Sequence, residues 1–176
     1  MVELSGANVL LRPLAHGDLD AFVASRDDDT GSFGVERGEA QRAKLLRLME
    51  RNPTLEDGGF LSLVIEADGE FIGDIQARAP KNGFPPGVCE MGITLVARAR
   101  GKGYGLEAVQ LFTEHLLANG WPRVQASTAL DNHAMRRVLE RAGYEFEGVL
   151  RGFAPGDDGA REDYAMYAAT RRPHAA

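Results

Sequence analysis

Residues 88–105, VCEMGITLVARARGKGYG, decide how this chain folds, because they join a strand pattern to a glycine-rich helix start. The apolar run Val88 to Val96 predicts a strand. Glycines follow at positions 101, 103 and 105, and the helical spacing of the later apolar residues predicts a helix over 103–119. Alternate glycines let a backbone direct several N–H groups at one anion, and a helix N-terminus favours negative charge. The stretch therefore predicts a strand, an anion-binding loop and a helix in series.

Three kinds of phosphate-binding loop share these features. A Walker A loop needs Gly-x4-Gly-Lys-Ser/Thr, and no such string occurs. Gly103 to Ala108 fits the dinucleotide pattern G-x-G-x-x-A, but that pattern follows its strand directly, whereas residues 97–101 intervene here. Arg100, Gly103 and Gly105 fit Arg/Gln-x-x-Gly-x-Gly/Ala, the pattern of acyl-CoA-binding N-acyltransferases. We therefore expect the loop to bind the diphosphate of an acyl-CoA, and a nicotinamide-dependent oxidoreductase is the weaker alternative.

Strands and helices alternate along the rest of the chain without a linker or a repeat, which predicts one domain over 1–176. Asp68-Gly69 lies between apolar runs and predicts a two-residue hairpin turn. Asp18 is expected to be the N-cap of the first helix. Hairpins joined by crossover helices predict a mixed α/β sheet rather than a doubly wound parallel one. The expected strands are 8–14, 60–65, 71–75, 88–96, 124–129, 144–153 and 161–170, and the expected helices are 19–25, 39–51, 103–119 and 131–142.

Composition narrows the classes of function. The chain has 176 residues and a formal net charge of −6, and this acidic balance argues against general nucleic-acid binding. No uncharged apolar run approaches the roughly 18 residues that span a bilayer, and no signal peptide is visible, so we expect a cytoplasmic protein that does not bind membranes. We expect the one cysteine, Cys89, to be a buried apolar residue. The four histidines lack metal-ligand spacing, so no metal is expected.

Taken in order, the motifs resemble the GNAT superfamily of N-acetyltransferases over nearly the whole chain. Residues 10–14 with Asp18 resemble the opening strand and helix of that family, and residues 89–95 resemble its central strand before the cofactor loop. Residues 131–144 resemble its next motif, and 146–151 (FEGVLR) resemble the ribosomal-protein N-terminal acetyltransferase (Rim-type) branch. The resemblance implies a central, mostly antiparallel sheet that is splayed at the cofactor site and flanked by helices.

The resemblance also implies an activity, namely direct transfer of an acetyl group from acetyl-CoA to a primary amine. The acceptor is expected to be a protein N-terminus or a small-molecule amine, and family members often form homodimers. A strand N–H near Leu95 is expected to stabilise the developing oxyanion. The residues that the resemblance assigns to acetyl-CoA are Ile93, Thr94, Leu95, Arg100, Gly101, Lys102, Gly103, Tyr104, Gly105, Asn132 and Arg137, with Arg136 and Arg141 as alternatives to Arg137.

Glu90, on the strand before the glycine loop, is the candidate general base and is expected to act through a water; the alternative is a structural ion pair. The general acid is harder to place. Leu139 occupies the position of the tyrosine found in many family members, and Ala134 that of a serine common in the Rim-type branch. Tyr164 on the last strand is the candidate substitute. Because both familiar acids are missing, a non-catalytic CoA-binding module is the alternative function. The other tyrosines considered are Tyr104 and Tyr167.

Three loops, at 26–38, 52–59 and 81–87, are expected to build the acceptor side. The first contains three consecutive aspartates, Asp27 to Asp29. These acidic residues favour a cationic acceptor.

Overall fold

The computed structural model describes residues 2–27, 37–51, 54–55, 59–79, 85–156 and 159–171. Much of the three loops expected to face the acceptor, including Asp28 and Asp29, lies outside these residues. The elements, in chain order, are β1 (Leu4–Ser5), β2 (Leu10–Arg12), α1 (Leu19–Asp27), α2 (Gly38–Arg51), β3 (Phe60–Ala67), β4 (Glu70–Arg78), β5 (Val88–Leu95), α3 (Tyr104–Ala118), β6 (Arg123–Ala129), α4 (His133–Arg141), β7 (Glu145–Pro155) and β8 (Arg161–Thr170).

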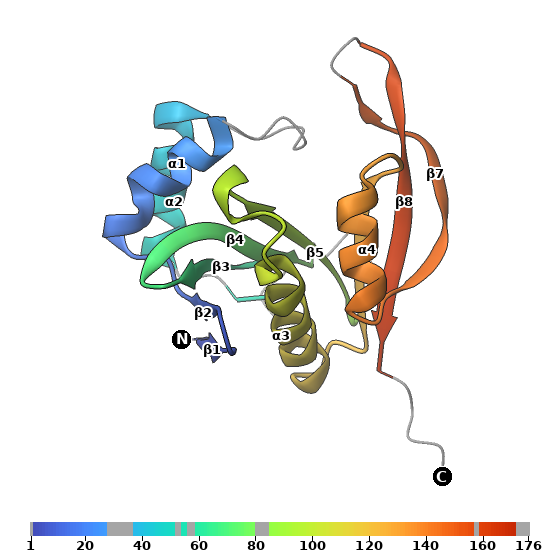
Figure 1. The fold of residues 1–176 in the computed structure, drawn as a ribbon, viewed down its shortest axis with the longest axis horizontal. Helices are drawn as coiled ribbons and strands as arrows, with labels where there is room; N and C mark the ends of the chain where they lie inside the picture. The colour runs from blue at the N-terminus through green and yellow to red at the C-terminus, as the bar shows by residue number, and fades with distance from the viewer. Residues whose placement is uncertain are drawn as a thin grey trace.

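The strands form one eight-stranded sheet in the order β1-β2-β3-β4-β5-β6-β8-β7 (Figure 1). The neighbouring strands are antiparallel except β5 and β6, which α3 connects as a crossover helix. This confirms the predicted mixed, mostly antiparallel sheet. The short β1–β2 hairpin was not predicted: the expected strand 8–14 is reduced to β2, and β1 precedes it. No helix among the described residues has the length and apolar character needed to cross a membrane.

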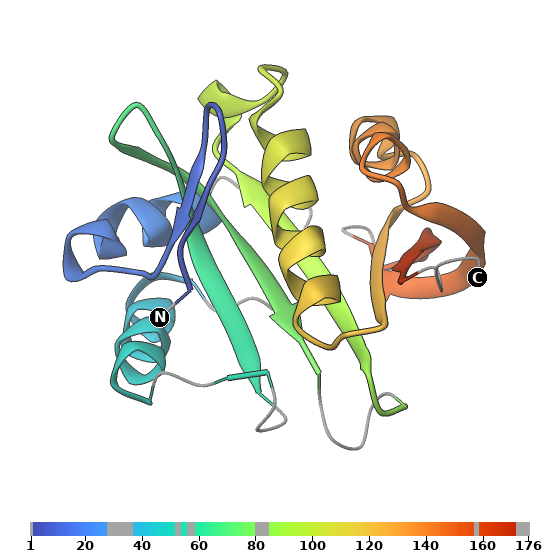
Figure 2. The same cartoon turned by 90° about the horizontal axis from the view of Figure 1, so that it is seen from below.

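The sheet separates two apolar cores, because successive side chains of a strand point to opposite faces. Val64 of β3 packs against α1 and α2, whereas its neighbours Leu63 and Ile65 belong to the core beneath α3. Figure 2 shows the same arrangement, with α3 along one side of the strands and α1 and α2 on the other. The two faces of the sheet therefore have different coverings, and each can hold a different part of a site.

One stripe of α3 fixes that helix on the sheet. Val109 and Phe112 are fully buried and Leu116 nearly so, at the spacing that places residues on one helical face. Burying a side chain of this size stabilises the fold by about 1.5–3 kcal/mol. The predicted stripe is confirmed at these positions, and it holds the N-terminus of α3 beside the end of β5.

Asp18 has a different role from the expected N-cap. It ends a short 3₁₀ turn before α1 and is buried. Its carboxylate accepts hydrogen bonds from both terminal nitrogens of Arg12, at 2.7 and 2.9 Å, and from the backbone N–H of Ala15 at 2.8 Å. Arg12 also donates to Glu66 at 2.6 Å. The N-cap prediction was therefore wrong, and Asp18 instead ties the start of α1 to β2 and β3.

The two parallel strands diverge partway along their length. β5 pairs with β6 at three positions, and the last of them joins Glu90 to Gln125. Beyond this pair, β5 continues beside β4 as far as Leu95, and β6 continues beside β8 as far as Ala129. The sheet therefore opens into a fork between β5 and β6, which confirms the expected splay.

Candidate active site

The glycines of the loop differ in why they are needed. Gly101 and Gly103 have φ angles of 74° and 90°, in the left-handed region that disfavours other residues. A Cβ at either position would meet no atom within 4 Å, so space stays open above the loop. Gly105 lies inside α3, where a Cβ would lie 3.2 Å from Cδ1 of Leu95. Backbone conformation thus requires the first two glycines, and close packing of α3 on β5 favours the third.

The loop leads directly to unused backbone donors. Gly103 is the N-cap of α3, and the N–H of Glu107 donates to its carbonyl oxygen at 3.2 Å. The N–H groups of residues 104–106 precede this first bond, and in any helix such groups have no intrahelical acceptor. Together with the positive end of the helix dipole they form an anion site. The residues present therefore fit a diphosphate.

The basic side chains near the loop divide into two groups. Arg98 turns toward the β3–β4 hairpin, where it donates to the Phe71 carbonyl at 3.1 Å and pairs with Glu70 at 3.2 Å. Arg100 donates through Nε to the carbonyl of Leu95 at 3.0 Å, and Lys102 is exposed. Arg100 and Lys102 are thus the cations placed at the loop itself.

The fork leaves one side of β5 uncovered by β6 at Ile93, Thr94 and Leu95. Their other side pairs with β4, through Ile75, Asp74 and Gly73. An extended ligand can add to such a strand edge through main-chain hydrogen bonds. The structure therefore brings the three residues assigned to the pantetheine arm to the open edge of the fork.

Asn132 and Arg137 lie beyond the end of β6, on α4. Asn132 is the N-cap of this helix, and its side-chain oxygen accepts from the N–H of Met135 at 3.1 Å. Its side-chain amide nitrogen has no hydrogen-bond partner among the described residues. Arg137 is exposed, whereas Arg136 donates to the Tyr167 hydroxyl and the Leu130 carbonyl, both at 3.1 Å. Of these two neighbouring arginines, Arg137 is the one available to a phosphate.

Glu90 occupies the last β5–β6 pair before the fork. Cys89 and Met91 on either side of it belong to the core beneath α3, so Glu90 points to the opposite face of the sheet. Its carboxylate accepts from Arg78 of β4 at 2.9 Å and from the Ser127 hydroxyl of β6 at 3.4 Å. Sequence reasoning missed both partners, since finding them requires the register of β4 and β6 against β5.

Tyr164 shares this face. Gln125, which pairs with Glu90, lies four residues before Ala129 on β6, so the two point to the same side. Ala129 in turn pairs with Tyr164. Tyr164 is 7% exposed, and its ring lies 5.4 Å from that of Phe153. It thus stands at the open end of the fork, on the Glu90 side.

The other tyrosines considered as acids are placed differently. Tyr167 is fully buried on the α4 side, where it accepts from Arg136 and donates to Glu140 at 2.9 Å. The hydroxyl proton of Tyr167 is therefore used in a structural hydrogen bond to Glu140. Tyr104 lines a cleft of about 220 Å³ between the loop and the β3–β4 turn, and no residue of β5 lines this cleft. Leu139 is fully buried in the core.

Cys89 is poorly placed to act as a covalent nucleophile. Cys89 is fully buried, and this burial raises the pKa of its thiol to about 12. A thiol must ionise and be reached by substrate to act as a nucleophile. In the described part of the chain, no group of three or more His, Cys, Asp or Glu side chains is arranged to hold a metal ion.

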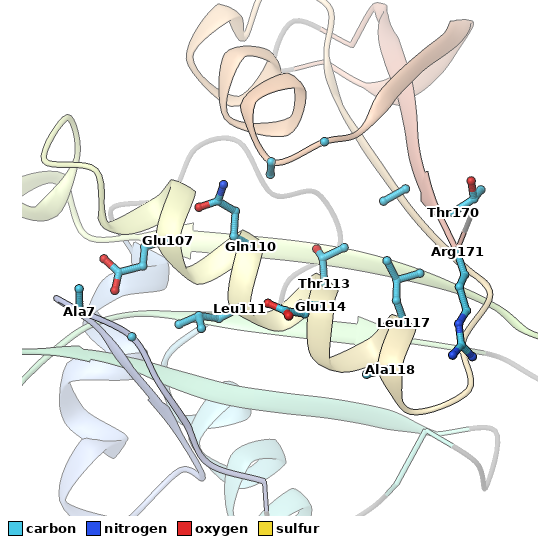
Figure 3. A pocket seen from close by; sticks show the side chains of 14 residues that line it. Ala7, Glu107, Gln110, Leu111, Thr113, Glu114, Leu117, Ala118, Thr170 and Arg171 are labelled. Carbon is cyan, nitrogen blue, oxygen red and sulfur yellow. The ribbon is translucent and has the colours of Figure 1, made fainter. Parts of the chain in front are cut away.

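A cavity of about 860 Å³ lies outside this site. It runs along α3 between the N-terminal hairpin and the end of β8 (Figure 3). Glu107, Glu114 and Arg171 provide its charged groups. Neither the glycine loop nor Glu90 lines it, so the candidate site is defined by the fork and not by this cavity.

Comparison with known proteins agrees with this geometry. The sequence profile of the acetyltransferase (GNAT) domain matches residues 8–145, so the chain belongs to the GNAT family of acetyltransferases. This confirms the predicted class, an acetyl-CoA-dependent acyltransferase. No curated protein matches the chain by sequence at a significant level.

Solved structures resemble the chain in fold. RimJ of Mycobacterium smegmatis, in complex with CoA-disulfide, has a TM-score of 0.77 and 24% identity, over 96% of this chain and 84% of that one. RimL, a ribosomal L7/L12 α-N-protein acetyltransferase in complex with CoA, has a TM-score of 0.80 and 18% identity, over 96% and 98%. The ribosomal-protein-S5-alanine acetyltransferase of Vibrio fischeri has a TM-score of 0.80 and 18% identity, over 98% of each chain.

Proposed function

We propose that this protein transfers an acetyl group from acetyl-CoA to a primary amine, with Glu90 as the general base. The proposal rests on one observation: β5 and β6 separate just beyond Glu90. A ligand bound on the α3 face of the sheet can therefore reach through the gap to the opposite face, where the Glu90 side chain lies. The candidate base lies near the N-terminal end of β5, and the loop that follows the C-terminal end of β5 leads to the anion site at the start of α3. A ligand held at the anion site can therefore present its far end to the candidate base.

The proposed cofactor contacts follow the same path. The loop and the N-terminus of α3 would hold the diphosphate, and the fork edge of β5 would pair with the pantetheine arm. Asn132 and Arg137 would meet the ligand from α4. The proposed contact residues are Ile93, Thr94, Leu95, Arg100, Gly101, Lys102, Gly103, Tyr104, Gly105, Asn132 and Arg137.

The chemistry is an exchange of one bond for another. Acetyl-CoA supplies a thioester, and the amine nitrogen bonds to its acyl carbon as the carbon–sulfur bond breaks. An alkylamine has a pKa of about 10.4, so Glu90 takes a proton from the nitrogen through a water. A backbone N–H of β5 in the fork donates to the carbonyl oxygen. Tyr164 or a water gives a proton to the departing sulfur, and the products are an acetylated amine and CoA.

The test is release of free thiol from acetyl-CoA in the presence of a panel of amines, with CoA binding measured by calorimetry on the same protein. The panel includes N-terminal peptides, because RimL is an α-N-protein acetyltransferase, together with amino acids and polyamines. We expect amine-dependent turnover. Tight CoA binding without turnover on any amine would favour the alternative, a non-catalytic CoA-binding module.

A homodimer in the cytoplasm is also part of the proposal. The described large apolar side chains that are exposed are Phe146, Val149 and Phe153, all on β7 at the edge of the sheet. A second copy that paired there would cover them. Light scattering of the eluting protein should give twice the chain mass, and Phe146→Glu should halve it. A monomeric wild-type protein would contradict the dimer and leave the proposed reaction standing.

A further inference from the structure

On the face of the sheet opposite α3, which we call the acceptor face, the Glu90 side chain lies next to a cation, Arg78. The two residues pair directly across β4 and β5, and Arg78 donates to Oε2 of Glu90 at 2.9 Å. The Glu90 side chain is 13% exposed, whereas the Arg78 side chain is 58% exposed. One end of the ion pair is therefore held within the sheet, and the other reaches into solvent.

Two described neighbours of this pair on the same face, Gln76 and Ser127, are neutral. Gln76 is the next residue of β4 on this face, and its side chain lies over Gly92, with Nε2 3.3 Å from the Cβ position of that glycine. Ser127 approaches Glu90 from β6. An arginine more than half exposed gains little from a single ion pair, because water competes for the guanidinium. Arg78 can therefore exchange Glu90 for another anion without a large loss of stability.

The proposed chemistry gives a reason for such an exchange. Glu90 must accept a proton by way of a water, and the guanidinium occupies one of the two oxygens that the water would approach. A ligand that brings its own anion would draw Arg78 away and free that oxygen. Guanidinium and carboxylate are a matched pair, because two parallel N–H donors meet two oxygens.

We propose, building on the proposed function, that Arg78 binds a carboxylate of the acceptor, and that the acceptor is a small amine carrying this carboxylate a few bonds from its nitrogen. Free amino acids are the simplest members of this class. Adjacent strands lie about 4.8 Å apart, so an amine beside Glu90 and a carboxylate beside Arg78 can belong to one small molecule. A protein N-terminus has a neutral amide at the position of this carboxylate, and Arg78 does not select it.

The proposal runs opposite to the cationic acceptor expected from Asp27 to Asp29. That expectation stays a prediction, because Asp28 and Asp29 lie outside the described residues. Arg78 is described, and it contacts the candidate base.

The experiment compares each amino acid with its own amide, for example methionine with methioninamide, in the thiol-release assay. Wild type, Arg78→Gln, Arg78→Lys and the control Arg47→Gln, an exposed arginine on α2, are measured in parallel. The two amines differ in basicity, so the quantity used is the acid-to-amide ratio of kcat/KM, and its change between variants cancels that difference.

We expect Arg78→Gln to lower this ratio at least tenfold, mainly by raising KM for the acid, and not to lower kcat/KM for the amide, which has no carboxylate for Arg78 to bind. Arg78→Lys should restore part of the ratio, and Arg47→Gln should leave it unchanged. An equal loss on acid and amide, or a ratio that Arg78→Gln does not alter, would overturn the proposal while leaving acetyl transfer intact.

A second measurement covers the case of no turnover. Calorimetry of the CoA-loaded protein should show the acid binding at least tenfold more tightly than the amide, and Arg78→Gln should remove the difference. If no amine supports turnover but this preference is present, the proposed function fails and the assignment of Arg78 stands. If neither turnover nor preference is found, both fail.

Discussion

The two sides of the fork are built by different means. On the α3 side, the anion site consists of backbone groups within consecutive residues, with Gly101 and Gly103 in left-handed conformations and the N–H groups of the first turn of α3 following. On the Glu90 side, the site consists of single side chains from separate strands, with Arg78 from β4 and Ser127 from β6. The first side should therefore depend mainly on backbone conformation, with Arg100 and Lys102 as the side chains that add charge. The second should depend on each side chain individually.

The largest effect should come from the acceptor side, at Glu90. Glu90→Gln keeps the size of the side chain and removes the proton acceptor, so kcat should fall by about 10²–10⁴-fold. The Kd for CoA should stay within threefold, because the carboxylate faces away from α3. Thiol release and calorimetry measure the two quantities. Glu114→Gln, on the exposed face of α3, is the control. Turnover that survives Glu90→Gln would show that the carboxylate has a structural role only.

The ion-pair network that ties the start of α1 to β2 and β3 should be the next most sensitive feature. Asp18→Asn leaves Arg12 with Glu66 as its one charged partner and should lower the free energy of unfolding by about 2 kcal/mol at pH 7. Asp20→Asn, whose side chain is 89% exposed, should cost less than about 1 kcal/mol. Urea unfolding measures both, and similar losses for the two variants would contradict the assignment.

The same network predicts a dependence on pH. The Arg12 hydrogen bond, against the effect of burial and helped by the N–H of Ala15, lowers the pKa of Asp18. An unfolded aspartate has a pKa of about 3.9. A lowered folded pKa gives stability that is present above the unfolded pKa and is lost as pH falls through the folded one. The stability difference between wild type and Asp18→Asn should therefore narrow below about pH 4. A difference that stays constant into acid would exclude an ionised Asp18.

This contrast also explains what the sequence could predict. The glycine loop, the α3 stripe and the Asp68-Gly69 turn are local patterns, so their positions follow from spacing alone. The partners of Glu90 come from tertiary register: the loop between β4 and β5 lies largely outside the described residues, and nothing in its sequence sets which residue of β4 meets Glu90. The role of Asp18 was mispredicted for the same reason, because its partner Arg12 lies on another element, β2, and the pairing depends on the tertiary fold.

Substitutions of Gly103 and Gly105 should affect CoA binding differently, because only Gly103 has a left-handed backbone conformation. Gly103→Ala forces a left-handed φ on alanine, which costs about 1–2 kcal/mol, so the Kd for CoA should rise about tenfold as the loop relaxes. Gly105→Ala meets only the terminal methyl of Leu95 and gains helix propensity of about 1 kcal/mol, so the Kd should change less than threefold. Calorimetry with CoA measures both. Equal losses of CoA affinity in the two variants would mean that the added side-chain volume, and not the left-handed backbone conformation, weakens binding.

The smallest effect should lie where the cofactor side meets the N-terminal hairpin. Glu107, in the first turn of α3, accepts from the backbone N–H of Asn8 at 2.8 Å and from its side-chain amide at 2.9 Å. Burial raises the pKa of Glu107, but the hydrogen bonds from Asn8, Val9 and Ala7 outweigh it and lower the pKa overall. The carboxylate is thus directed at the hairpin, although it stands one turn from a site for diphosphate.

Glu107→Gln keeps one acceptor oxygen and removes the charge, so it should lower the free energy of unfolding by about 1 kcal/mol. If the hairpin holds the carboxylate away from the anion site, the Kd for CoA should change less than threefold, since the charge already has its partners. Urea unfolding and calorimetry test the two parts, with Glu114→Gln on the same helix as the control. Much tighter CoA binding by Glu107→Gln would show instead that this charge acts on the diphosphate, and that the cofactor side too depends on a side chain.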